Sequence, residues 1–170
     1  MRPCRALAIA AIFQCCACSV LAADLTNRDK EYLRERAGQL VGDIRIGELA
    51  TRQASTEMVR AFGYRMVNDH KRSLENVQKV AAARNVELPA EPPERYAKAL
   101  QKLTALSGNE FDVQYMRRAL HEHRINIKAD GKRKYGTKDS QLRLLASGSH
   151  DMEMAHMALA NKALATVPAK

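Results

Sequence analysis

The sequence predicts an all-α protein: a four-helix bundle with one extra short helix in the connection between the second and third long helices. Two observations predict this class. No stretch alternates apolar and polar residues as a strand does, and good helix formers (Ala, Leu, Arg, Lys, Glu, Gln, Met) dominate the chain. Four long amphipathic segments then favour a bundle, which buries all of their apolar faces together.

The first two long helices are expected over residues 27–54 and 56–83. Thr26 precedes the first of them and is a suitable N-cap, while Ser55 marks a break between the two. Glycine inside a helix either weakens it or permits close contact with a neighbouring helix, and the first helix contains three glycines: Gly38, Gly42 and Gly47.

The end of the second helix is set by three prolines within five residues, since proline cannot continue a helix: Pro89, Pro92 and Pro93. A short helix is expected over 94–106, and the Ser-Gly-Asn turn at 107–109 caps the next long helix. The third and fourth long helices are expected over 110–134 and 140–165, joined by a turn.

The N-terminal segment has the features of a secretory signal peptide. Arg2 and Arg5 are followed by an apolar run, and small or aliphatic residues precede a cleavage site after Ala22 or Ala23. We therefore expect a signal peptide over 1–23, one domain over 24–170, and a periplasmic or secreted protein; a retained anchor is the alternative. All four cysteines lie before residue 19, so the mature chain offers no thiolate as nucleophile or ligand.

The charge of the chain does not indicate a nucleic-acid partner. The formal net charge is +9, but the basic residues are spread along the chain, aromatic residues are few and Trp is absent. We interpret this charge as a solvated surface with weak attraction to anionic envelope surfaces. No feature of the sequence names a partner or an oligomeric state.

Helical periodicity places three of the five histidines on apolar stripes, one in each of three helices: His70, His123 and His156. Each lies about 13 to 16 residues into its expected helix, so all three should meet near mid-length. His121 and His150 fall on the opposite faces. In the last helix the inward seam is expected to contain Leu142, Leu145, Ser149, Met152, His156, Leu159 and Ala163.

Carboxylates near these histidines add candidate metal ligands. Asp69 adjoins His70, and Glu153 lies three residues before His156, a spacing that lets both side chains reach one ion. A di-iron centre would need a second Glu-x-x-His pair, which the sequence lacks. A mononuclear site for a transition metal such as zinc, copper or iron remains, and a metal-free hydrogen-bonded core is the alternative, because burying unpaired imidazoles costs about 2 kcal/mol or more each.

The segments AFGYRMVNDHKRSLENVQKVAAARNVELP, LSGNEFDVQYM and HMALA resemble the signature of the bacterial domain of unknown function 4142 family. The resemblance covers roughly residues 30–165 and implies an exported, ferritin-like helical bundle without an established activity. Asp43 stands where that family usually has Glu in the first helix, which makes it a further candidate ligand. Glu153 replaces a residue that is usually apolar.

The sequence therefore favours an exported binding or envelope-stress protein with a mid-core site. The candidate metal ligands are His70, His123, His156, Glu153, Asp69 and Asp43. The alternative is a helical interaction or structural module that binds no ligand. The sequence does not decide whether the protein is an enzyme, but it disfavours one, because the chain shows no nucleophile–base pair and no phosphate loop. If the protein is an enzyme, metal-dependent redox chemistry is the activity that fits these residues.

Overall fold

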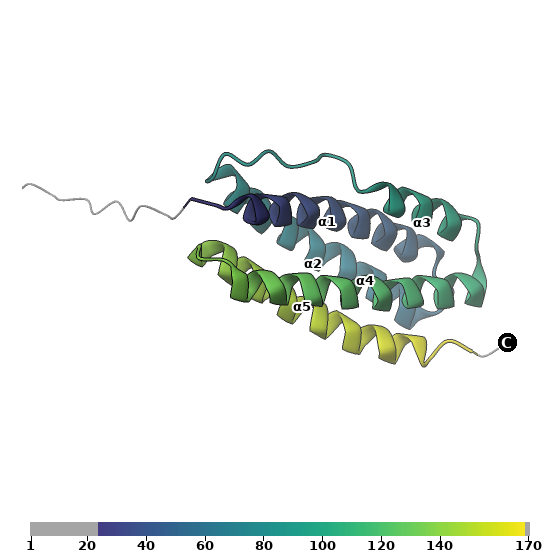
Figure 1. Ribbon diagram of the computed structural model, residues 1–170. Helices are drawn as coiled ribbons and strands as arrows, with labels where there is room; N and C mark the ends of the chain where they lie inside the picture. The colour runs from purple at the N-terminus through teal and green to yellow at the C-terminus, as the bar shows by residue number, and fades with distance from the viewer. Residues whose placement is uncertain (1–23, 169–170) are drawn as a thin grey trace, which may run out of the picture.

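The computed structural model describes residues 24–168, and within them the protein is all-helical. The expected signal peptide at 1–23 lies outside the described residues. The long helices lie side by side, and a short helix lies at the edge (Figure 1). In chain order these are α1 (Asn27–Gln53), α2 (Glu57–Ala82), α3 (Glu94–Thr104), α4 (Gly108–Gly136) and α5 (Ser140–Leu164). The predicted boundaries are confirmed to within about two residues. None of the helices in residues 24–168 has the length and hydropathy needed to cross a membrane.

Local capping signals explain where three of the long helices begin. Thr26 and Asp29 form a reciprocal capping box at the start of α1, as the sequence predicted for Thr26. The side chains of Thr56 and Asp139 accept hydrogen bonds from backbone N–H groups in the first turns of α2 and α5. These side chains satisfy backbone donors that a helix leaves unpaired at its N-terminus.

The proline-containing segment after α2 returns the chain along the outside of the bundle to α3 (Figure 1). α3 then packs against α1, where the ring of Tyr96 occupies the position that a Cβ on Gly42 would take. Of the two roles that the sequence left open for this glycine, close contact is therefore the one observed.

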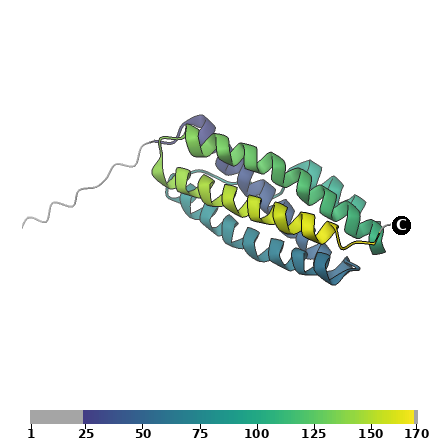
Figure 2. The same ribbon diagram turned by 90° about the horizontal axis from the view of Figure 1, so that it is seen from below.

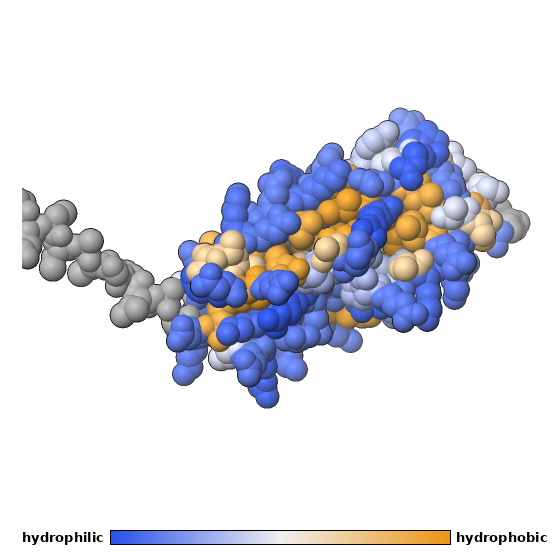
Figure 3. Space-filling view, turned by 90° about the horizontal axis from the view of Figure 1, so that it is seen from above, coloured by the Kyte–Doolittle hydropathy of each residue, from blue (hydrophilic) through white to orange (hydrophobic). Residues whose placement is uncertain are grey.

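The long helices pair in chain order, α1 with α2 and α4 with α5. Figures 1 and 2 show each pair as neighbouring antiparallel helices joined by a short turn. The contact between α2 and α5 is less extensive than the contacts within each pair. Seen from the side of α3, hydrophobic residues form a band that hydrophilic side chains interrupt (Figure 3).

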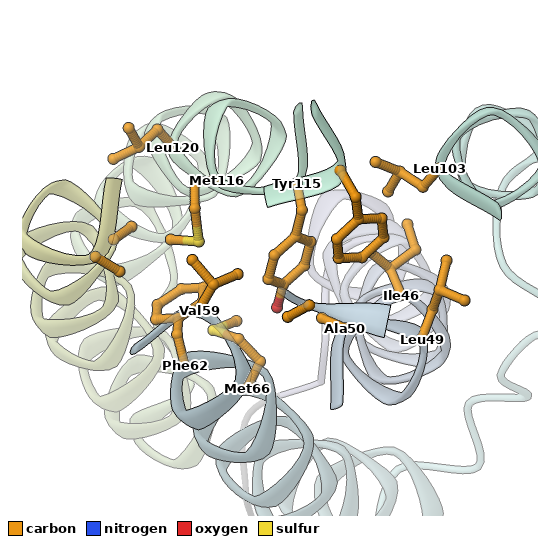
Figure 4. Packing of buried hydrophobic residues seen from close by; sticks show 14 of the residues in the cluster. Ile46, Leu49, Ala50, Val59, Phe62, Met66, Leu103, Tyr115, Met116 and Leu120 are labelled. Atoms are coloured by element: carbon orange, nitrogen blue, oxygen red, sulfur yellow. The ribbon is translucent and has the colours of Figure 1, made fainter. Parts of the chain in front are cut away.

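The buried apolar residues form two clusters. One includes Val59, Phe62 and Met66 of α2, packed against Met116 and other residues of α1, α3, α4 and α5 (Figure 4). The other gathers residues nearer the opposite end, including Leu33, Leu40, Val77, Leu142 and Ala146. In α2 and α5 the histidines lie in the sequence between the residues of the two clusters. The polar site therefore lies between two apolar regions.

The inward seam of α5 differs from the predicted one. Leu159 was expected inside but is 42% exposed, and Leu145 and Met152 are only half-buried. The buried positions are instead Leu142, Ala146, Ser149, Glu153, His156, Ala160 and Ala163. Compared with the prediction, α5 is rotated about its axis so that Glu153 faces Arg36 of α1. Ala146 and Ala160 are therefore buried where Leu145 and Leu159 were expected.

Candidate functional site

Three helices bring three histidines together in the interior. His70 of α2, His123 of α4 and His156 of α5 are 0%, 1% and 0% exposed. The ring centroids of His70 and His123 lie 6.1 Å apart, those of His70 and His156 5.2 Å, and those of His123 and His156 5.3 Å. Of the other two histidines, His121 is exposed and His150 is half-buried beside Asp151. The inward and outward sorting made from periodicity therefore agrees with the structure.

Glu153 is the carboxylate at the centre of this cluster and is fully buried. Its Oε1 atom accepts a hydrogen bond of 2.5 Å from Nη2 of Arg36 and one of 3.3 Å from the amide of Asn126. Its Oε2 atom contacts Nδ1 of His123 but accepts no hydrogen bond of normal geometry. One oxygen is therefore held in place, while the other faces the imidazoles.

Several ring nitrogens of the cluster have no hydrogen-bond partner in the described structure. Both nitrogens of His70, Nε2 of His123 and Nδ1 of His156 are buried and unpartnered. One ligand atom each from His70, Glu153 and His156 lies within 4.8 Å of the others. Unsatisfied buried polar atoms are rare in folded proteins, so their gathering at one point calls for an explanation.

The surroundings keep two imidazoles neutral and the carboxylate charged. Burial lowers the pKa of His70 well below its ordinary value and also lowers the pKa of His156. Burial alone would raise the pKa of Glu153, but the guanidinium of Arg36 and the imidazole of His123 hold it well below its ordinary value. Neutral imidazole and ionised carboxylate are the protonation states that bind metal ions.

An apolar wall borders the imidazoles. The ring of Phe62 in α2 lies edge-on to two of them, with centroids 6.5 Å from His123 and 6.4 Å from His156. Phe62 belongs to the apolar cluster shown in Figure 4 and is 4% exposed. It excludes water from this side, which strengthens electrostatic interactions among the polar groups.

Asp69 borders His156 on the side of its Nε2 atom. Its carboxylate is 3.0 Å from Nε2 of His156 and also contacts the guanidinium groups of Arg65 and Arg72. Burial alone would raise the pKa of Asp69, but hydrogen bonds from His156 and the two arginines outweigh it and lower the pKa to about 2. A charged Asp69 fixes the proton of His156 on Nε2, so the Nδ1 atom, which has no hydrogen-bond partner, keeps a free lone pair.

Asp43 belongs to a neighbouring polar pocket. It lines a cavity of about 20 Å³ together with Tyr115, Arg118 and His123, and its buried Oδ2 atom has no hydrogen-bond partner. Burial, reinforced by the charge of Glu153, raises the pKa of Asp43 to about 7. Of the six predicted ligands, the structure thus brings four together and leaves Asp69 and Asp43 at the edge.

Sequence reasoning missed Arg36 and Asn126, which orient Glu153. Arg36 is 1% exposed. It lies three residues after Leu33 on the apolar stripe of α1, and this position could have indicated that its side chain is buried. Asn126 follows His123 by three residues and therefore shares its face of α4. Glu122, a carboxylate that adjoins His123 in the sequence, is buried with Tyr96 and Arg118 and lines the same small cavity as Asp43 and His123.

Chemically, the cluster offers neutral nitrogen donors and one anionic oxygen in a water-poor interior. The residues that could hold a metal ion are His70, Glu153 and His156, with His123 in reach of the same carboxylate.

Comparison with known proteins identifies a family and a fold. The sequence model of a family described as domain of unknown function (DUF4142) matches residues 18–163. No protein of curated function matches the chain. A solved structure, described as a crystal structure of a DUF305 fragment from Deinococcus radiodurans, is similar with a TM-score of 0.75 and 10% sequence identity. The similarity covers 84% of this chain and 99% of that one, and it shows a shared fold.

Proposed function

The chain belongs to the DUF4142 family, whose function is unknown, and we propose that it binds one transition metal ion among the mid-length histidines. The observation that carries this proposal is that donor atoms of His70, Glu153 and His156 lie within 4.8 Å of one another while both nitrogens of His70 lack a partner. A buried imidazole with neither nitrogen bonded is costly unless something else binds it.

The distances support the proposal. Histidine nitrogens and carboxylate oxygens bind zinc at about 2.0 to 2.2 Å, so donors of one tetrahedral ion lie about 3.3 Å apart. The three donor atoms now lie within 4.8 Å of one another. Shifts of about 1 Å in each side chain would bring them to the separation that one ion requires. Two imidazoles and one carboxylate form a donor set used for zinc and for non-haem ferrous iron.

Residues around the donors would have separate roles in such a site. Arg36 and Asn126 hold one oxygen of Glu153 and leave the other for the ion. Asp69 would orient His156 through Nε2, as carboxylates commonly do for metal-bound histidines. His123 would provide the fourth ligand, because its Nε2 is unpartnered and its Nδ1 contacts Glu153.

A second candidate function is a helical module that binds no ligand. The buried pair of Arg36 with Glu153 favours it, because the guanidinium already balances the charge of the carboxylate at the centre of the histidine cluster. In this case the histidines would only fill and specify the core. The two candidates predict different responses to added metal.

Titration with zinc, copper and ferrous iron by isothermal calorimetry separates the candidates. The metal site predicts one ion per chain, a higher melting temperature with metal, and at least tenfold weaker binding by His70→Ala and His156→Ala. His121→Ala is the matched control, since His121 is exposed on α4 and touches none of the donors. Equal binding by all variants, or no binding by the parent, would support the module instead.

Two further properties, export and a ferritin-like fold, are also proposals. We infer that residues 1–23 are a signal peptide cleaved near Ala22 or Ala23, which would release the whole described domain from residue 24 onward. N-terminal sequencing of the cell-envelope protein tests this. We also infer a ferritin-like four-helix bundle, supported by the pairing of α1 with α2 and of α4 with α5.

A further inference from the structure

A groove of about 800 Å³ runs between α2 and α5, which contact each other less than the helices within the α1–α2 and α4–α5 pairs do. Its α2 wall extends from Arg65 to Ala83 and its α5 wall from Gln141 to His156. At 1.5 Å per residue the groove is about 25 Å long. Its volume is within the range of pockets that bind small organic molecules.

One wall of the groove is cationic. Arg65, Arg72 and Lys79 follow one another at intervals of seven residues, so they lie in one row along α2. Asp69 is the one acidic side chain among the described lining residues, and the two arginines already contact it. Lys79 pairs with no carboxylate in the part of the chain that the structure describes. An unbalanced positive charge therefore remains at the Lys79 end.

The other wall is uncharged and largely apolar. Leu144, Leu145 and Met152 of α5 line it, and Leu144 is 76% exposed. Val80 of α2 adds an aliphatic side chain next to Lys79. Midway along the α5 wall lies Gly148, where an added Cβ would meet no atom within 4 Å. The groove is thus open at its centre and combines a spare cation with aliphatic surface.

We propose that this groove binds an amphipathic organic anion, a carboxylate that carries an alkyl chain. Its head group pairs with Lys79, and its chain lies along Val80, Leu145 and Met152. Charge complementarity selects an anion, and the aliphatic wall selects an apolar chain. A helix of a partner protein, which would lay its apolar face along the same wall, is the alternative occupant that the experiment tests. The groove borders the proposed metal site at His156 and Asp69, but the residues assigned to the anion are not ligands of the metal.

Binding of a fluorescent alkyl carboxylate, 11-(dansylamino)undecanoic acid, to the purified protein tests the proposal. We expect saturable binding with a dissociation constant in the micromolar range. Lys79→Gln should lower the affinity for the probe about tenfold. Gly148→Trp should fill the groove and abolish binding without disturbing the fold, because its Cβ meets open space. Lys128→Gln and Ala158→Trp are matched controls at positions outside the groove and should bind as the parent does.

Several results would overturn the proposal. Equal binding of the probe's methyl ester would show that no charge is recognised. Equal loss in the controls and in the groove variants would place the probe elsewhere. The absence of saturation up to about 100 μM, or binding of an acidic helical peptide that the probe cannot displace, would exclude the alkyl carboxylate as the occupant. Circular dichroism of each variant establishes that binding is compared between folded proteins.

Discussion

Replacement of Arg36 by methionine tests how the buried charges are held. Arg36 is 1% exposed, and its Nη2 lies 2.5 Å from Oε1 of the fully buried Glu153. Arg36→Met keeps an unbranched apolar stem of similar length but removes the guanidinium. Glu153 then keeps the hydrogen bond from the amide of Asn126 and the contact with His123. It has lost the guanidinium that formed its buried ion pair.

The expected loss is large relative to the total stability of such a domain. Removing one partner of a buried ion pair costs about 3–5 kcal/mol, because the remaining charge stays desolvated. Domains of this size are stabilised by about 5–15 kcal/mol in total. With a shift of about 2–4 °C per kcal/mol, the melting temperature should fall by about 10 °C.

Urea denaturation followed by circular dichroism measures this loss. The matched control is Arg34→Met on the same helix, because Arg34 is 45% exposed and lies 3.9 Å from the exposed Glu31. A surface pair of this kind contributes at most about 1 kcal/mol. The double variant Arg36→Met/Glu153→Gln should recover part of the loss, since it removes the stranded charge. A loss below about 1 kcal/mol for Arg36→Met would refute the view that this pair organises the site.

Three further perturbations test separate contacts. Gly42→Ala places a Cβ in the ring of Tyr96, so denaturation should show a loss of about 1–3 kcal/mol, and an unchanged midpoint would contradict the close packing of α3 on α1. Burial raises the pKa of Asp43 from 3.8 to about 7, so the stability that protonated Asp43 contributes is lost as the pH rises from about 4 to about 7. Relative to the parent, Asp43→Asn should therefore gain stability as the pH rises from about 4 to about 7, and a constant difference would contradict this. Burial lowers the pKa of His70 and His156, so below about pH 6.5 the unfolded chain binds more protons and stability falls. Denaturation of Asp43→Asn at pH 7.5 and 5.5 measures this fall without the titration of Asp43, and equal stability at both would contradict it.

The helices could be predicted because their signals are local. Thr26 caps α1 through residues three positions away, and the prolines after α2 prevent helix by their own chemistry. The meeting of the histidines was also predictable, since direction and depth along a helix follow from residue number alone. Both kinds of argument need no knowledge of partners distant in sequence.

The partners of Glu153 could not be predicted, because they come from other helices. Arg36 lies 117 residues away in the chain, and periodicity shows only that it shares an apolar stripe. The same interaction decides the rotation of α5: an apolar pattern containing Leu145, Met152 and Leu159 favoured another face, but the ion pair requires Glu153 inside. Asp69 was expected beside His70, and its contact with His156 of another helix depends on how α2 and α5 pack.

The central claim, one transition metal ion at the mid-length histidines, is tested most directly by elemental analysis of untagged protein purified from the organism's own cells. The account predicts close to one equivalent of a single transition metal per chain, and its loss in a His70→Ala strain but not in a His121→Ala strain. Protein that is fully folded and contains only traces of metal, or equal metal content in both variants, would contradict it.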